Sequence, residues 1–165
     1  MITFSHSVEI AAAPHQVFAL LDDLRTTPTW LDRCIKVEMG EPVRYHFRQG
    51  GGRIGIMNAT IVKRLADQQL LLTLRDKLAE VHIDQRLTQS LTGSAIAGQR
   101  SPGSSMIVPA SQRSLGSPST TLTCSIEVRP LTLAGKLMTP LIRKHLPTAI
   151  MRATDRIKAR VEVAP

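Results

Sequence analysis

The chain has few cysteines and few aromatic residues, and each scarcity excludes a class of protein. Its two cysteines, Cys34 and Cys124, are too few for the disulfide framework of a small secreted domain. The five histidines are scattered without the spacing of a zinc site, so no metal and no other cofactor is predicted. Aromatic residues make up 3% of the chain and do not alternate with basic ones, which makes nucleic-acid binding by base stacking a poor interpretation.

Long hydrophobic runs are also lacking. No apolar stretch approaches the roughly 20 residues that span a bilayer, and the first residues lack the basic and apolar regions of a secretion signal. Hydrophobic residues make up 42% and charged residues 21% of 165 residues, which is typical of one globular domain. We therefore expect a single cytoplasmic domain over residues 1–165 without a transmembrane segment.

The net charge of +8 is concentrated near the C-terminus, where residues 119–165 hold eight Lys and Arg against three Asp and Glu. Arg152, Arg156 and Arg160 follow one side of a predicted helix. The simplest interpretation is a solvated basic face, because charge alone reports solubility and weak anion attraction. The alternative is an interaction module that uses this basic C-terminal helix for weak contact with an anionic membrane or an acidic partner.

Hydrophobic periodicity predicts the order of the elements. Residues 2–10 alternate as a half-buried strand, and Pro14 then suits the start of a short helix that ends before Trp30. Short turn-forming separators divide the following region into antiparallel strands. Alternation places Tyr45, Phe47, Gln85 and Cys124 on the face that points away from water. The predicted strands after the first cover residues 34–39, 43–48, 53–64, 69–75, 79–88 and 121–128.

Two segments follow other patterns. Residues 91–118 are half Ser, Gly and Pro, which predicts a long loop insertion. Residues 131–163 return to helical spacing, with an apolar stripe that includes Ile150 and Ile157. Because Pro147 removes a backbone hydrogen bond, we expect two helical pieces with a bend between His145 and Thr148.

Several stretches together resemble the START-like (SRPBCC) superfamily of the polyketide cyclase/dehydrase and lipid-transport type. They are the run from Ile10 to Asp23 followed by Pro28-Thr29-Trp30, the segment 120–123, and the segment 133–141. The resemblance implies an α+β helix-grip fold. In that fold a curved antiparallel sheet of six to seven strands surrounds a long C-terminal helix, and two short helices follow the first strand. The loop at 91–118 and Pro147 depart from the family pattern.

A curved sheet leaves a hollow beneath its helix, and such a hollow is an apolar ligand site by default. We therefore expect the chain to bind a hydrophobic small molecule, such as a polyketide, a lipid or an isoprenoid-like compound. Asn58 is included on the condition that its strand presents Ile54, Ile56 and Val62 inward. The expected lining is Trp30, Tyr45, Phe47, Asn58, Gln85, Cys124, Met138, Ile142 and Met151.

The alternative within the same family is a true cyclase or dehydrase, which must move protons. That hypothesis uses Tyr45 as a tentative proton donor, with Asn58 or Gln85 positioning a carbonyl. A core tyrosine bonded to a backbone carbonyl or water is the competing interpretation. Cys124, with no neighbouring base in the sequence, is interpreted as an inert core residue. Whether the protein is an enzyme stays open at this point.

Overall fold

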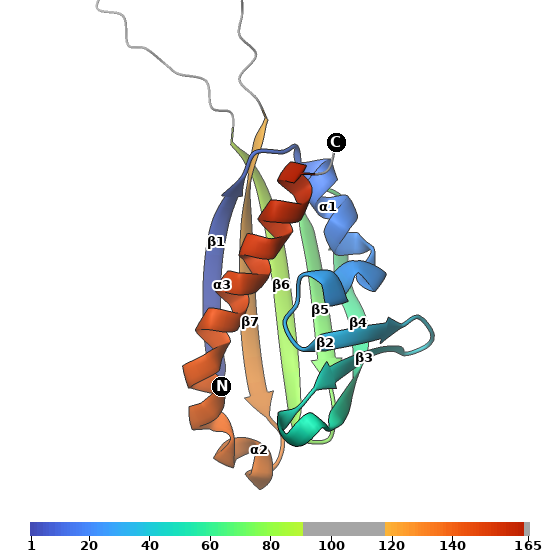
Figure 1. The fold of residues 1–165 in the computed structure, drawn as a ribbon, viewed down its shortest axis with the longest axis vertical. Coiled ribbons are helices and arrows are strands. Elements are labelled where there is room, and N and C mark those ends of the chain that lie inside the picture. Colours follow the sequence, from blue (N-terminus) through green and yellow to red (C-terminus); the bar gives the residue numbers. More distant parts are fainter. Residues whose placement is uncertain (91–117, 164–165) are drawn as a thin grey trace, which may run out of the picture.

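The computed structural model describes residues 1–90 and 118–163, which form an antiparallel sheet and a helical layer on one of its faces (Figure 1). The described strands make one seven-stranded sheet in the order β1-β7-β6-β5-β4-β3-β2. The strands are β1 (Ile2–Ile10), β2 (Cys34–Glu38), β3 (Val43–Arg48), β4 (Ile54–Leu65), β5 (Gln69–Arg75), β6 (Ala79–Ser90) and β7 (Ser119–Pro130). The helices are α1 (Pro14–Asp22), η1 (Leu24–Thr29), η2 (Gly50–Gly52), α2 (Leu133–Leu137) and α3 (Thr139–Val163).

The strand order places the first and the last strand of the chain side by side. β1 pairs with β7 over its whole length, from Ile2 opposite Val128 to Ile10 opposite Thr120. The remaining strands follow one another through neighbouring antiparallel pairs. α3 packs on β1 and β7, whereas α1 packs on β5, β6 and β7. This arrangement confirms the predicted α+β helix-grip fold.

The core lies between the helices and the face of the sheet that they cover, which we call the inner face. Side chains of this face alternate with exposed ones, as the strand patterns predicted: Leu70 and Leu122 are completely buried, and Tyr45 is 1% exposed. The stripe on α3 is buried against them, including Ile150 and Ile157. None of the helices in residues 1–90 and 118–163 is both long and apolar enough to cross a membrane.

The helix division predicted at Pro147 is wrong, because α3 runs from Thr139 to Val163 without interruption. Pro147 removes the amide that would bond the carbonyl of Arg143. Arg143 is exposed, so water can satisfy its carbonyl at little cost. The break between the two helices lies at Met138, which ends α2 just before α3 begins at Thr139. The predicted loop insertion lies outside the described residues, except for Pro118.

The β5–β6 turn approaches α2 closely at the lower end of the molecule as drawn in Figure 1. The Leu131 amide donates a hydrogen bond of 2.8 Å to the Leu78 carbonyl. Gly135 is buried against that same carbonyl, and a β-carbon at this position would collide with the oxygen atom. A glycine is therefore required here for close approach to backbone.

We expect Gly135→Ala to destabilise the fold by about 1–3 kcal/mol, because overpacking against backbone outweighs the helix propensity that alanine adds. Urea denaturation measures the change in the free energy of unfolding. Gly50→Ala is the matched control, since nothing lies within 4 Å of a β-carbon at Gly50. Equal stability of the two variants would contradict the assigned contact.

Candidate functional site

Three polar side chains form a row across the inner face of the sheet. In the strand register His6 on β1 lies opposite Cys124 on β7, and Cys124 lies opposite Gln85 on β6. The next residue in the row, Leu70 on β5, is apolar and completely buried. The sequence analysis selected Cys124 and Gln85 but missed His6. Its position between the inward residues Phe4 and Val8 was the signal that would have found it.

Gln85 is the most unusual residue of this row. Its side chain is 1% exposed, yet neither Nε2 nor Oε1 has a hydrogen-bond partner among the described residues. Leaving a buried amide unbonded costs about 1–3 kcal/mol for each unmatched group. The inner face therefore presents one donor and one acceptor in otherwise apolar surroundings.

The two cysteines have the properties of inert core thiols. Both are free and buried. Burial raises the pKa of the Cys124 thiol to about 12 and that of Cys34 to about 11. Neither thiol forms an appreciable amount of the reactive thiolate at neutral pH, which agrees with the interpretation of Cys124 as a core residue.

Tyr45 links β3 to the short helix η1. Its hydroxyl shares a hydrogen bond of 3.5 Å with Oγ1 of Thr27, and its ring stacks on Phe47 with centroids 6.1 Å apart. Burial raises the pKa of Tyr45 to about 12, so the hydroxyl stays protonated at neutral pH. The contact with Thr27 thus gives the buried hydroxyl a side-chain partner on η1.

Trp30 lies at the end of η1, where the sequence analysis placed it. The indole is 6% exposed, and its Nε1 donates a hydrogen bond of 3.4 Å to Oγ1 of Thr26. Trp30 belongs to the same apolar core as Tyr45 and Ile150. Its polar atom is therefore matched within the η1 segment itself.

Burial of the inner face is uneven. Residues level with α1 and the C-terminal half of α3 are completely buried, as Leu70 and Leu122 illustrate. Toward the β5–β6 turn and α2 some inward apolar residues are only half-buried, although Leu74, Ile126 and Val128 stay buried there. These half-buried residues are Phe4, Phe47, Met57, Val81, Ile142 and Leu146. The inner face therefore becomes accessible to solvent from the lower end of the molecule.

The two methionines chosen as pocket walls are more exposed than expected. Met138, between α2 and α3, is 48% exposed, and Met151 on α3 is 45% exposed. Met138 lies at the lower end, near the accessible part of the inner face. Met151 sits beside the buried Ile150 but faces solvent with nearly half its surface. Ile142 is half-buried and packs against the core.

The inward orientation of Asn58 is corrected by the structure. Asn58 lies opposite Arg75 in the register, on the outer face of the sheet, while its neighbour Ala59 points inward and is buried. The condition for its selection fails, since Ile54 and Ile56 are 58% and 49% exposed. The physical reason is that β4 carries apolar residues on both faces, so alternation did not identify the buried one.

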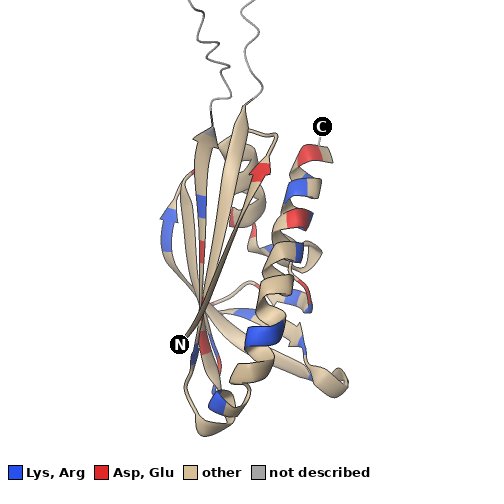
Figure 2. Ribbon diagram, turned by 90° about the vertical axis from the view of Figure 1, so that its left-hand side faces the viewer, with Lys and Arg blue, Asp and Glu red and all other residues tan. Residues whose placement is uncertain are grey.

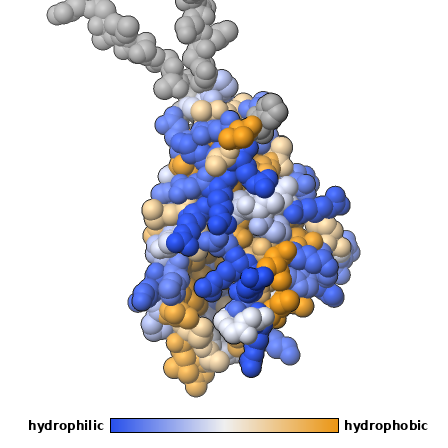
Figure 3. Space-filling view, viewed as in Figure 1, coloured by the Kyte–Doolittle hydropathy of each residue, from blue (hydrophilic) through white to orange (hydrophobic). Residues whose placement is uncertain are grey.

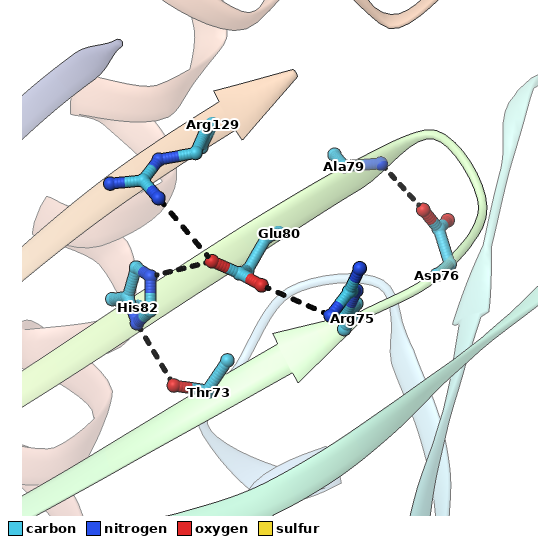
Figure 4. A network of polar contacts seen from close by, with 7 residues as sticks. All are labelled: Thr73, Arg75, Asp76, Ala79, Glu80, His82 and Arg129. Atoms are coloured by element: carbon cyan, nitrogen blue, oxygen red, sulfur yellow. Dashed lines mark hydrogen bonds and ion pairs between the residues drawn. The ribbon is translucent and has the colours of Figure 1, made fainter. Parts of the chain in front are cut away.

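The outer face carries an open hollow and a polar network. Asn58 and Arg75 help to line an open hollow of about 1010 Å³ on this face. Figure 4 shows Glu80 at the centre of the network, which joins β5, β6 and β7. The Glu80 carboxylate lies 3.0 Å from His82, 3.8 Å from Arg75 and 4.0 Å from Arg129. These contacts balance charge across three strands on the side away from α3.

The groups required by the cyclase hypothesis are not gathered at one point. Asn58 faces away from Tyr45. Gln85 lies opposite Leu70, at one end of β5. Tyr45 lies opposite Met57 on β4, near the other end of β5, where Asn58 pairs with Arg75. No hydrogen bond joins Tyr45 to Gln85 within residues 1–90 and 118–163. Tyr45 and Gln85 thus share a face but not a reaction centre.

The basic stripe of α3 is partly neutralised. Arg156 binds Asp32 at 2.6 Å, and Arg152 lies 3.8 Å from the same carboxylate. Because Asp32 follows η1, these ion pairs fasten α3 to the segment that carries Trp30. Two of the three arginines expected to contact a partner therefore have a structural contact within the molecule.

Comparison with known proteins agrees with this architecture. The family model described as polyketide cyclase / dehydrase and lipid transport matches residues 1–162. No curated protein gave a significant match.

Similar solved structures support the same fold. A START superfamily protein from Mycobacterium smegmatis is similar at 16% identity with a TM-score of 0.65, covering 97% of each chain. A protein from Deinococcus radiodurans has 12% identity and a TM-score of 0.64, covering 99% of this chain and 98% of its own. The di-domain ARO/CYC BexL from the BE-7585A biosynthetic pathway has 13% identity and a TM-score of 0.62, covering 99% of this chain and 51% of its own.

We expect the hydroxyl of Tyr45 to ionise at about pH 12 in the folded protein, against about 10 in the unfolded chain. Tyr45 is the only tyrosine, so the ultraviolet absorbance of tyrosinate reports it alone. A raised pKa in the folded state means that the stabilising contribution is complete below pH 10 and is lost as pH rises toward 12. Folded protein that titrates near pH 10 would contradict the burial of this hydroxyl.

Proposed function

The chain belongs to the polyketide cyclase/dehydrase and lipid transport family, and from that premise we propose that it binds a hydrophobic small molecule on the inner face of its sheet. The ligand class is a polyketide, a lipid or an isoprenoid-like compound with one hydrogen-bonding group. The hydrocarbon part of the ligand contacts the half-buried apolar residues, and its polar group bonds to Gln85.

The unbonded carboxamide of Gln85 is the observation that carries this proposal. A fully apolar residue at this position would cost nothing to bury, whereas the amide needs a partner. A carbonyl or hydroxyl group of a ligand matches the amide, which offers both a donor and an acceptor. His6 and Cys124 continue the same row and add a limited polar surface beside it.

The half-buried apolar residues at the lower end support an entry route from there. Phe47, Met57 and Val81 lie on β3, β4 and β6 and are half-buried there. Ile142 and Leu146 on α3 are half-buried against the same core. Surfaces of this kind bind hydrocarbon by removing apolar area from water. The polar group of the ligand enters first and reaches the more deeply buried Gln85.

Binding fits the arrangement better than cyclase chemistry does. Tyr45 already contacts Thr27, and its raised pKa makes it a weaker acid than an ordinary tyrosine. Proton transfer is most efficient when the pKa of the catalytic group lies near the working pH. A hydrogen-bonding role for Gln85 requires no proton transfer at all.

We expect Gln85→Leu to weaken binding of a fluorescent fatty alcohol by about tenfold, which corresponds to the loss of roughly one hydrogen bond. Binding of pyrene, which has no hydrogen-bonding group, should be unchanged or tighter. The variant should also be at least as stable as the wild type, because an unmatched buried amide is removed. Fluorescence titration and urea denaturation measure these effects.

Gln89→Leu is the matched control, since Gln89 lies on the same strand but is exposed. It should leave both affinities unchanged. If the folded wild-type protein binds neither probe, the proposed function is wrong. If Gln85→Leu binds the fatty alcohol as tightly as the wild type does, Gln85 is not the polar contact.

A further inference from the structure

We propose that the lower tip of the molecule docks on the surface of an anionic lipid bilayer. The lower tip consists of α2 and the beginning of α3, with the exposed apolar residues Leu133, Leu137, Met138 and Leu141. It lies at one end of the longest axis of the described chain (Figure 1). A flat surface can therefore contact the tip without obstruction by the sheet.

The apolar residues of the lower tip are unusually exposed. Leu133 and Leu137 are each 75% exposed, Leu141 is 49% exposed and Met138 is 48% exposed. Figure 3 shows the hydrophobic surface that gathers at this end of the molecule. Isolated exposed leucines are ordinary, but a contiguous group at a protruding end is typical of a contact surface.

The geometry of α2 explains why these leucines face outward. Gly135 must face the protein because it packs on the Leu78 carbonyl. Successive helical residues are rotated by about 100°, so the residues two positions before and after Gly135 point away from the sheet. Those residues are Leu133 and Leu137. The close glycine contact that fixes α2 therefore also presents both leucines to solvent.

The surroundings of the tip are cationic. Residues 131–154 contain Lys136, Arg143, Lys144 and Arg152 but neither Asp nor Glu. Figure 2 shows basic segments along α3, while its acidic segments lie toward the C-terminal end. Exposed leucines flanked by Lys and Arg match a bilayer with anionic headgroups, because apolar side chains enter the interface while cations stay at the phosphates.

The β5–β6 turn carries one carboxylate, which is bonded to the backbone of the turn. Asp76 in the β5–β6 turn accepts hydrogen bonds from the Leu78 and Ala79 amides at 2.7 and 2.8 Å. Lys77 in the same turn is exposed and adds a further cation. The charge pattern near the tip therefore favours an anionic partner.

A bilayer fits the tip better than a second copy of the chain does. A two-fold interface would place the same patch on both subunits, so Lys136 would face an equally basic surface. The chain already carries a net charge of +8, which adds to this repulsion. An anionic bilayer instead attracts every cation around the leucines. The proposal holds whether or not the inner face binds a ligand.

Vesicle co-sedimentation tests the docking directly. We expect the protein to bind vesicles of phosphatidylcholine mixed with phosphatidylserine and to bind phosphatidylcholine alone at least tenfold more weakly. Leu133→Ser combined with Leu137→Ser should lower binding to the mixed vesicles by at least tenfold. The matched control, Ile54→Ser with Ile56→Ser, removes two apolar side chains of 58% and 49% exposure from the outer face and should bind as the wild type does.

A charge variant measures the electrostatic contribution to vesicle binding separately from the apolar contribution. Lys136→Gln, Arg143→Gln and Lys144→Gln together should abolish the preference for phosphatidylserine. The matched control, Arg25→Gln with Lys63→Gln and Arg160→Gln, removes three exposed cations outside the lower tip and should keep that preference. Circular dichroism and urea denaturation establish that each variant is folded before its binding is compared.

Three results would overturn the proposal. The first is a folded wild-type protein that binds neither kind of vesicle, and the second is undiminished binding by the double serine variant at Leu133 and Leu137. The third is a wild-type dimer in sedimentation equilibrium that becomes monomeric in the same variant, because a second copy then covers the tip. Probe binding is measured without vesicles, so failure of the proposed function is distinguishable from failure of the docking.

Discussion

The pairing of β1 with β7 is the constraint on which the rest of the structure depends. Nine residue pairs join the two strands, from Ile2 opposite Val128 to Ile10 opposite Thr120. The segments are distant in the sequence, so their pairing closes a long stretch of chain before α3 begins. α3 then packs on these same two strands. α3 therefore covers the part of the inner face that β1 and β7 form. Other elements must cover the part that β3 to β6 form.

That covering is incomplete, and the proposed function follows from where it ends. α1 packs on β5, β6 and β7, and η1 closes over Tyr45 through Thr27. No comparable element of the described residues reaches Phe47 and Met57 at the lower end, where they remain half-buried. One face of the sheet thus has a polar row that includes the buried, unbonded Gln85 and apolar residues that are partly open to solvent.

The sequence was sufficient for the fold because most strands have only one apolar face. The pattern around Tyr45 and Leu122 therefore identified the buried side correctly. The same reasoning failed on β4. Ile54 and Ile56 point to one face of the sheet and Met57 and Ala59 to the other, so both faces of this strand carry apolar residues. Burial of one face is decided by tertiary packing, which is absent from a local pattern.

Pro147 and His6 show two further limits of sequence reasoning. The loss of one helical hydrogen bond at Pro147 is a local cost, and α3 accommodates it because the freed carbonyl belongs to the exposed Arg143. His6 was missed for a different reason. Its strand was recognised, and its position between the inward residues Phe4 and Val8 indicated its orientation, but that position was not used as the alternation around Gln85 was. Its relation to Cys124 and Gln85 appears only in the strand register.

The distribution of charge gives the two ends of the molecule different properties. On the outer face Glu80 is surrounded by Arg75, His82 and Arg129, and on α3 the pair of arginines near Asp32 is held by its carboxylate. Around the lower tip the cations lack carboxylates in their own segment. The open part of the inner face lies at that same end. A bilayer bound to the lower tip would therefore face the apolar residues that lead toward Gln85, and a hydrophobic ligand would pass between membrane and protein with little exposure to water.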